Sequence, residues 1–275
     1  MTTTDRAATA VDFARRLRAH TLRMVHRANS SHVGSCFSMA DILSVLYTDT
    51  LHVDPAQPAM PGRDRFILSK GHAAAGVYAA LALRGFIPEA DLDSYGADGS
   101  AFMAHISHKV PGVEFSTGSL GHGLPFAVGK AMAAKKSGAA WRVFAVLGDG
   151  EMDEGSVWEA LMFSAHHKLD NLVAIIDCNN LQSLTTVEAT LNIEPLADKI
   201  RAFGGVPVEV DGHDHRALLE LFDRIPFEAG KPSIVIARTV KGKGVSYMEN
   251  KVEWHYRSPD AELLAQALRE VGGEP

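Results

Sequence analysis

The sequence is poor in cysteine and has no long apolar segment. Its 275 residues include only Cys36 and Cys178, too few for the disulfide framework of a small secreted domain. The longest unbroken apolar stretches, such as 143–147 and 172–176, are strand-sized, whereas a membrane-spanning helix needs ~20 residues. Residues 1–10 contain no apolar signal-peptide core. We therefore expect a soluble, cytoplasmic protein with no membrane partner.

An excess of positive charge is also missing. The chain has 27 Lys and Arg against 33 Asp and Glu, a net charge of −6, and no stripe of basic residues. Nucleic acid is therefore not expected as a partner. Hydrophobic residues make up 46% and charged residues 22% of the chain, values typical of globular proteins and unlike those of disordered ones.

The second half of the sequence alternates apolar strands with helical segments. Strands are expected over 143–147, 172–176, 206–210 and 233–239, and helices over 153–168, 196–203 and 216–224. Continuous apolar strands that alternate with helices are typical of a parallel sheet covered on both faces. The sequence predicts an α/β fold with a doubly wound, mostly parallel sheet and helices on both faces, formed by a single domain over 1–275.

Helical and irregular segments surround this pattern. We predict an N-terminal helical extension over about 1–50, with one helix over 10–29 and a second that Ser38 caps. A last helix is expected over about 259–270. Residues 96–123 are rich in Gly, Ser, His and Pro without clear periodicity, and a loop of that length is usually functional or disordered.

Polar residues follow two of the predicted strands where each strand ends. Asp149 lies between two glycines after the strand 143–147, and Asn179 follows the strand 172–176. Ligands bind at the carboxyl ends of parallel strands, and a carboxylate and an amide oxygen suit Mg²⁺ or Ca²⁺. One charged ligand is a weak metal site by itself. The pattern therefore favours a metal whose coordination a diphosphate completes.

Histidines in glycine-rich or irregular segments form the second group of candidates. They are His32, His72, His105, His122 and His255. Neutral imidazoles bind hydroxyl groups and transfer protons near neutral pH, so several around one diphosphate would suit a polyhydroxylated substrate. The sequence shows no HExxH or CxxC spacing of a zinc site.

Several motifs in order along the chain resemble the N-terminal part of transketolase, from about residue 10 to 257. They are Asn29-Ser30-Ser31-His32, Ser69-Lys70-Gly71-His72, Pro111-Gly112-Val113-Glu114, Thr117-Gly118-Ser119-Leu120-Gly121, Gly148-Asp149-Gly150-Glu151, Asn179-Asn180, Thr239-Val240-Lys241-Gly242-Lys243-Gly244-Val245-Ser246 and Trp254-His255. In transketolase this part binds thiamine diphosphate and Mg²⁺.

The resemblance implies a role for each matching residue. The implied metal ligands, for Mg²⁺ or alternatively Ca²⁺, are Asp149, Asn179 and the backbone carbonyl of Leu181. The implied cofactor contacts are His72, Gly118, Leu120, Gly150, Glu154, Asn179 and His255. The implied catalytic histidines, which bind donor hydroxyls and the carbonyl oxygen, are His32, His72, His105 and His255. Glu154 and Glu159 resemble buried acids at the interface between subunits.

Other parts of the transketolase site have no match before Pro275. In the family, the glutamate that activates thiamine and the arginines that hold a sugar phosphate lie in the following pyrimidine-binding domain. The resemblance therefore implies the N-terminal subunit of a split transketolase with a separate C-terminal subunit, in an α₂β₂ heterotetramer that is inactive without that partner. Its activity would transfer a two-carbon ketol unit from a ketose or ketose phosphate to an aldose.

Two alternatives stay open at this point. A related two-subunit thiamine enzyme could pass its two-carbon unit to a carrier thiol or other acceptor in a biosynthetic pathway, or could decarboxylate a 2-oxoacid. A non-catalytic subunit could bind the cofactor only to stabilise an assembly. The chain also departs from the common family pattern on the substrate side: His122 replaces a glutamine, Tyr256 and Arg257 replace a glycine and a small residue, and Ala104-His105-Ile106 replaces Gly-His-Pro.

Overall fold

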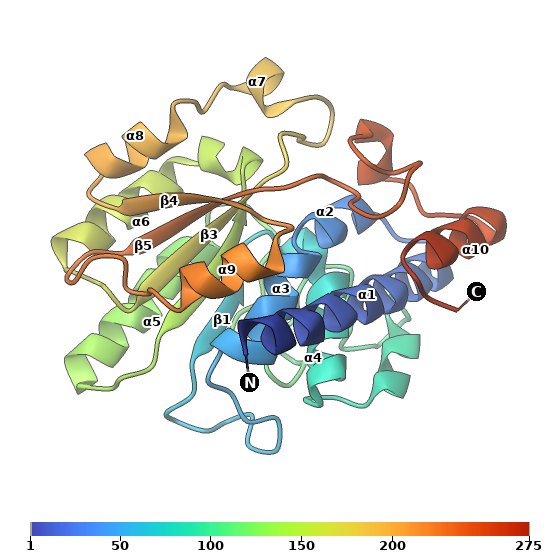
Figure 1. The fold of residues 1–275 in the computed structure, drawn as a ribbon, viewed down its shortest axis with the longest axis horizontal. Coiled ribbons are helices and arrows are strands. Elements are labelled where there is room, and N and C mark those ends of the chain that lie inside the picture. Colours follow the sequence, from blue (N-terminus) through green and yellow to red (C-terminus); the bar gives the residue numbers. More distant parts are fainter. Residues whose placement is uncertain (1, 275) are drawn as a thin grey trace.

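Five parallel strands form a sheet in the computed structural model, which describes residues 2–274 (Figure 1). Along the sheet their order is β1-β2-β3-β5-β4, and every neighbouring pair is parallel. The strands are β1 (Arg65–Leu68), β2 (Val143–Gly148), β3 (Leu172–Cys178), β4 (Val206–Asp211) and β5 (Ser233–Arg238). The predicted α/β fold with a parallel sheet is confirmed.

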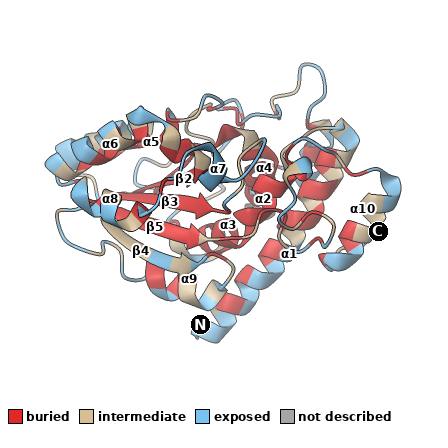
Figure 2. Cartoon of the chain, turned by 90° about the horizontal axis from the view of Figure 1, so that it is seen from above, coloured by how far each residue is buried: buried red, intermediate tan, exposed pale blue. Residues whose placement is uncertain are grey.

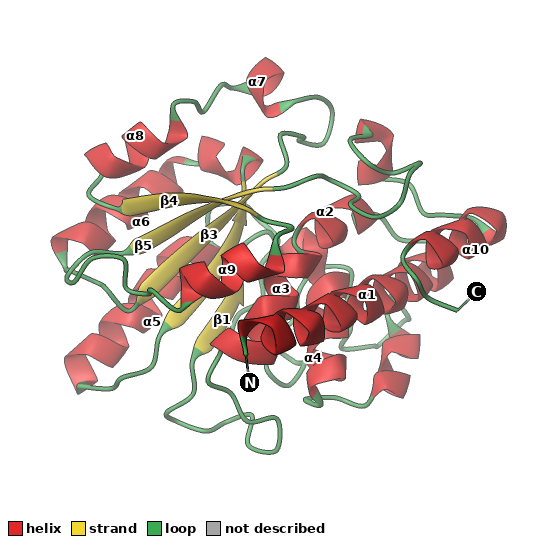
Figure 3. Cartoon of the chain, viewed as in Figure 1, coloured by secondary structure: helices red, strands yellow, loops and turns green. Residues whose placement is uncertain are grey.

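Helices cover both faces of this sheet, and Figure 3 shows the layers. The α-helices are α1 (Thr3–Ala28), α2 (Val33–Ser38), α3 (Ala40–Val45), α4 (Ala74–Arg84), α5 (Gly123–Ser137), α6 (Gly155–His166), α7 (Val187–Thr190), α8 (Leu196–Ala202), α9 (His215–Phe222) and α10 (Ala261–Glu270). A π-helix, Leu46–Thr50, follows α3. Short 3₁₀ helices lie at Gly71–Ala73, Glu89–Ser94, Gly150–Asp153 and Val252–His255.

Each central strand contributes to two hydrophobic cores, because successive side chains point to opposite faces. In β2, Phe144 and Val146 pack with the core that holds α1, α3, α4 and α9, whereas Ala145 and Leu147 pack with the core under α5, α6 and α8. All seven residues of β3 are buried, and Figure 2 shows the buried strands between the two layers. Burial on both faces explains the unbroken apolar runs of the sequence.

A buried ion pair joins the long helix α1 to α3. Arg18 donates to both carboxylate oxygens of Asp41 in α3, at 2.9 and 2.7 Å. His213, which precedes α9, contacts the same carboxylate through Nδ1 at 2.7 Å, and its Nε2 accepts from Val240 N–H at 2.8 Å. Burial by itself would raise the pKa of Asp41. The Arg18 guanidinium outweighs this effect and holds that pKa well below its usual range. One carboxylate thus joins α1, α3 and the loops after β4 and β5.

Some sequence-based boundaries are wrong. The first helix begins at Thr3 rather than at residue 10, because Thr2 and Asp5 form a capping box. Ser38 does not cap the helix that follows it, because α3 begins at Ala40 after Met39. Ser38 is the last residue of α2, and its hydroxyl donates a hydrogen bond to the buried Asp177. The last helix begins at Ala261, capped by Asp260. None of the helices within residues 2–274 has the length and the apolar character needed to cross a membrane.

Replacing Arg18 by Met should lower the free energy of unfolding by about 3–5 kcal/mol, because it leaves the Asp41 carboxylate buried without its main partner. Equilibrium urea unfolding measures this loss. Arg16→Met is the matched control on the same helix: the Arg16 ion pair with Glu89 is exposed and should be worth less than about 1 kcal/mol. Equal losses in the two variants would contradict the proposed anchoring role of Arg18.

Candidate active site

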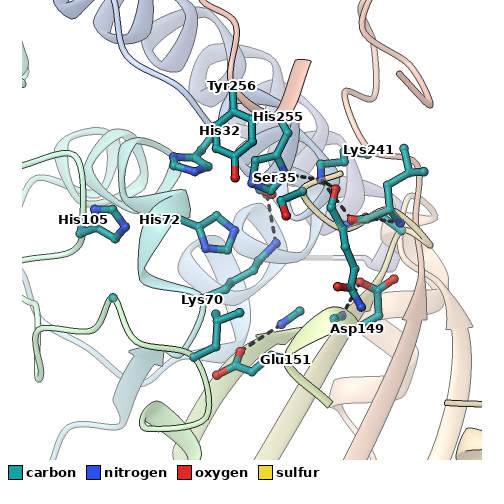
Figure 4. Close-up of a pocket in the computed structure, with 18 residues that line it drawn as sticks. His32, Ser35, Lys70, His72, His105, Asp149, Glu151, Lys241, His255 and Tyr256 are labelled. Carbon is teal, nitrogen blue, oxygen red and sulfur yellow. Dashed lines mark hydrogen bonds between the residues drawn. The ribbon is translucent and has the colours of Figure 1, made fainter. Parts of the chain in front are cut away.

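A cavity of about 270 Å³ lies at the carboxyl ends of β1, β2 and β3 (Figure 4). Residues far apart in the sequence line it, because the parallel strands end at the same edge of the sheet. The cavity brings together ten of the eleven site residues predicted from the sequence: His32, His72, His105, Gly118, Leu120, Asp149, Gly150, Asn179, Leu181 and His255. The long irregular segment 96–123 contributes three of them.

Asp149 is a buried carboxylate at the end of β2. Its Oδ1 accepts from Gly150 N–H at 2.8 Å and its Oδ2 from Asn180 N–H at 2.5 Å. Burial, followed by the negative charge of Asp177, raises the pKa of Asp149 to about 6. A positive ion beside this carboxylate would remove that penalty.

Asn179 and Leu181 present further oxygen atoms on the neighbouring strand end. β2 pairs with β3 so that Gly148 lies opposite Asp177, which places Asn179 next to the Asp149 segment. The Asn179 amide oxygen accepts from Leu181 N–H at 3.1 Å. The carbonyl oxygen of Leu181 accepts from the Lys241 ammonium at 3.0 Å, so this carbonyl already faces a positive charge.

This donor set fits a hard divalent cation. One carboxylate, one amide oxygen and one backbone carbonyl are ligand types that Mg²⁺ and Ca²⁺ accept. Within residues 2–274, no group of three or more His, Cys, Asp or Glu side chains is placed to hold a metal. A metal at Asp149 would therefore need neutral oxygens and additional anionic ligands, which a diphosphate can supply.

Four histidines lie close together on the other side of the cavity. The ring centroid of His32 is 5.0 Å from those of His72 and His255 and 6.0 Å from that of His105. His32 has a left-handed backbone, with φ 74° and ψ 14°, a conformation that costs a non-glycine residue free energy. Its N–H donates to the carbonyl of His255 at 2.8 Å, which holds both residues in place.

Three of these imidazoles are neutral at pH 7. Burial, followed by the charges of His105 and Lys241, lowers the pKa of His32 to about 4. Burial and Lys241 lower the pKa of His255 to about 3. The pKa of His72 lies well below its usual value because of burial and the Lys70 ammonium. A neutral imidazole donates one hydrogen bond and accepts another, which suits hydroxyl groups and proton transfer.

A buried ion pair supports the floor of the cavity. Lys70, the second residue after β1, forms an ion pair with Asp177 of β3, and both side chains are almost completely buried. The same carboxylate accepts from Ser38 of α2 at 2.5 Å and from Thr239, which follows β5. Asp177 therefore joins the ends of β1, β3 and β5 to α2.

The structure separates Glu154 and Glu159 from the other predicted residues. Both are exposed in this chain, and neither lines the cavity. Glu159 lies instead beside an open apolar groove between α5 and α6. The buried acid nearest to Asp149 in the sequence is Glu151, whose carboxylate accepts from Gly121 N–H at 2.9 Å and Gly148 N–H at 3.2 Å.

Sequence reasoning assigned no role to several residues that line the cavity. They are Ser35, Lys70, Glu151, Gln182, Ser183 and Lys241. Gly148, one of the two glycines around Asp149, and Tyr256, a departure from the family pattern on the substrate side, line the cavity as well. Lys70 and Lys241 stand inside motifs that the sequence displayed, each followed by a glycine. A lysine beside a glycine is usually exposed, so only the fold shows that both ammonium groups turn inward.

The free energy of unfolding should fall as the pH is lowered from about 6.5 to 4. In that range the unfolded chain protonates His32 and His255, whereas the folded chain keeps them neutral. Asp149, whose pKa is raised to about 6, acts in the opposite direction but contributes one proton against these two. Urea unfolding at several pH values measures the slope. The slope of the unfolding free energy against pH is proportional to the number of protons taken up on unfolding. His32→Ala should lower this number by up to about one. Ser183→Ala, which removes no ionisable group from the same cavity, should leave it unchanged. An unchanged slope in His32→Ala would contradict the depressed pKa.

Comparisons with known proteins agree with this geometry. Residues 9–275 match the family described as "Transketolase, thiamine diphosphate binding domain". The chain is 42% identical over 254 residues to one subunit of apulose-4-phosphate transketolase from Phocaeicola vulgatus, covering 92% of this chain and 90% of that protein. It is 36% identical to the 6-deoxy-6-sulfo-D-fructose transketolase subunit SqwG of a Clostridium species, covering 94% of each.

A solved structure shows the same fold. Transketolase from Campylobacter jejuni superposes with a TM-score of 0.90 at 32% identity, over 98% of this chain but only 43% of that chain. The present chain thus spans less than half of the solved transketolase and nearly all of the curated subunits. The predicted resemblance is confirmed: the chain belongs to the transketolase family, in which it corresponds to the N-terminal, thiamine diphosphate-binding part.

Proposed function

We propose that this chain is the N-terminal subunit of a two-chain transketolase that transfers a two-carbon ketol unit from a ketose phosphate to an aldose. The proposal rests on one observation: Asp149 and Asn179 line the same cavity as a cluster of histidines that are neutral at pH 7. The first half suits a metal-bound diphosphate and the second suits a chain of hydroxyl groups.

Asp149, Asn179 and the Leu181 carbonyl would hold Mg²⁺, with Ca²⁺ as an alternative. Thiamine diphosphate, when bound, supplies the carbon nucleophile that carries the two-carbon unit between donor and acceptor. Gly150 and Lys241 would contact its diphosphate, since both line the Asp149 end of the cavity; in this structure the Gly150 N–H donates to Asp149. This chain's task there is to bind and orient the cofactor.

The neighbouring residues would fix the remaining contacts of the cofactor. His72 and His255 lie between the Asp149 end and the outer histidines, so they can reach both diphosphate and substrate. Gly118 and Leu120 line the same wall and can offer backbone groups to the aminopyrimidine ring. A Cβ at Gly118 would lie 3.4 Å from the His105 ring, an ordinary contact distance, so this backbone faces His105 directly.

The outer histidines would bind the donor sugar. His32 and His105 lie 6.0 Å apart across the cavity, a spacing that lets two imidazoles contact one short polyhydroxylated chain. Because its pKa is lowered to about 4, His32 is neutral at pH 7, and a ring nitrogen can accept a hydrogen bond from a donor hydroxyl as that hydroxyl loses its proton. A 2-oxoacid donor would need fewer such partners, so the cluster favours a ketose.

Two relatives indicate the class of sugar. Their names assign them apulose 4-phosphate and 6-deoxy-6-sulfo-D-fructose, both of which are ketoses that carry an anionic group. We propose a donor of the same class for this chain. Residues that bind the anionic group would come from the partner subunit, since the cations of this chain's cavity, Lys70 and Lys241, lie at its cofactor end.

A separate C-terminal transketolase subunit would complete the site, in an α₂β₂ heterotetramer. Three of the relatives that this chain covers almost completely are named as subunits, which supports a two-chain enzyme. Glu154 and Glu159 are exposed here; Glu154 directly precedes α6, and Glu159 borders the apolar groove of α5 and α6. Contact with another subunit at this face would bury both acids, and Glu154 would then lie near the cofactor, as the family resemblance implies.

The chain combined with a C-terminal transketolase subunit, thiamine diphosphate and Mg²⁺ should transfer a ketol unit from xylulose 5-phosphate to ribose 5-phosphate, whereas the chain alone should be inactive. Asp149→Asn should weaken metal-dependent cofactor binding in the complex by more than about 100-fold, since even outer-shell changes cost 10–100-fold. Coupled enzyme assays and calorimetry measure these effects.

Asp198→Asn is the control for that experiment, because this carboxylate is exposed and pairs only with Arg201 on the same helix. It should leave binding and activity unchanged. Release of CO₂ from pyruvate without ketol transfer would refute the transketolase proposal and leave the cofactor site intact.

Replacing His32 by Ala should lower kcat of the assembled enzyme by roughly 10²–10⁴-fold, the usual cost of losing a general acid or base. Cofactor affinity should stay close to that of the wild type, because His32 lies on the substrate side. His52→Ala removes an exposed histidine before β1 and serves as the control. A fully active His32→Ala enzyme at saturating cofactor would overturn the assignment.

A further inference from the structure

Tyr256 occupies a special place at the rim of the cavity. It follows the 3₁₀ helix Val252–His255 and lines the cavity, yet 59% of the residue is exposed. Its ring centroid lies 4.7 Å from that of His255 and 5.9 Å from that of His32. Figure 4 shows the ring above these two histidines with its hydroxyl directed into the cavity.

The backbone around Tyr256 is fastened on both sides. Before it, the His255 carbonyl accepts from His32 N–H at 2.8 Å. After it, Ser258 donates to the carbonyl of Val25 at 3.0 Å, and the carbonyl of Pro259 lies 2.8 Å from His26 Nδ1. The segment is thus clamped to the end of α1. The phenol ring cannot leave the cavity by a movement of this segment unless these contacts break.

The ring lies on the substrate side of the cavity rather than on the cofactor side. The cofactor end is marked by Asp149 and Lys241, whereas the Tyr256 ring meets the rings of His32 and His255 at interplanar angles of 62° and 59°. In Figure 4, His105 and Tyr256 lie on different sides of His32, and no hydrogen bond joins Tyr256 to the other residues drawn. A donor chain that runs from His105 past His32 would therefore meet the Tyr256 ring next.

We propose that Tyr256 is a specificity-determining residue, whose ring forms a wall on the substrate side and favours ketose phosphates with a short carbon chain beyond the transferred unit. This inference rests on the proposed ketol transfer. A phenol ring is rigid and has only two side-chain torsions, so it gives way little to extra substrate atoms. One additional carbon against such a wall typically changes kcat/KM by about 10–200-fold.

The test compares three donors of equal charge and increasing length: xylulose 5-phosphate, fructose 6-phosphate and sedoheptulose 7-phosphate. The enzyme is the assembled complex with its C-terminal subunit, saturated with thiamine diphosphate and Mg²⁺, and the acceptor is kept constant. Tyr256→Ala should raise the ratio of kcat/KM for the seven-carbon over the five-carbon donor by at least about tenfold. Tyr256→Phe keeps the ring and should change this ratio by less than about threefold.

Calorimetric affinity for thiamine diphosphate shows whether the variants keep an intact site, and it should be equal in wild type, Tyr256→Ala and Tyr256→Phe. If Tyr256→Ala does not assemble, Tyr256→Leu replaces it, with a smaller change in the same direction.

An unchanged donor ratio in an intact Tyr256→Ala enzyme would overturn the inference and leave the proposed function standing. So would equal effects of the Ala and Phe variants, which would show that the hydroxyl rather than the ring matters. A wild-type complex that uses none of the three donors would overturn the proposed function itself, and the inference with it.

Discussion

The buried ion pair of Lys70 and Asp177 is the interaction on which the rest of the site depends. The pair lies at the carboxyl ends of the strands, and the Asp177 carboxylate also binds Ser38 and Thr239. This carboxylate therefore connects β1, β3, the segment after β5 and α2. Burying two charges is costly unless each is well paired. Such a pair therefore tolerates little displacement, and it fixes the strand ends that carry the cavity residues.

This arrangement also sets the electrostatics of the cavity. The Asp177 charge adds to burial and keeps the Asp149 pKa near 6, while the ammonium of Lys241, whose pKa burial lowers to about 8, contacts carbonyls and the His255 ring. Among residues 2–274, Asp149 accepts from backbone N–H groups and Lys241 contacts carbonyls and an imidazole, and neither forms an ion pair with an oppositely charged side chain. A diphosphate with its metal supplies both, an anion for the lysine and a cation for the carboxylate. The neutral histidines beyond them leave the substrate side polar without charge.

Much of this could be predicted from the sequence, because the signals were local. Apolar strands predicted the parallel sheet, and polar residues at two strand ends located Asp149 and Asn179. The sequence did not reveal that Lys70 and Ser38 both bind Asp177 in the interior. Each contact joins residues more than 100 positions apart, and hydrophobic periodicity reports only on local structure. Glu154 is exposed in this chain, and the burial that the family resemblance implies for it depends on the proposed partner subunit, which the sequence of one chain does not contain.

The central claim is that this cavity holds a metal-bound diphosphate. Calorimetric titration of thiamine diphosphate into the complex of this chain with its C-terminal subunit, with Mg²⁺ and with a chelator instead, tests it most directly. We expect thiamine diphosphate to bind tightly in the presence of Mg²⁺ and this binding to be lost with the chelator. Equally tight binding of thiamine diphosphate without the metal, or no binding in either case, would contradict a metal-bound diphosphate in this cavity.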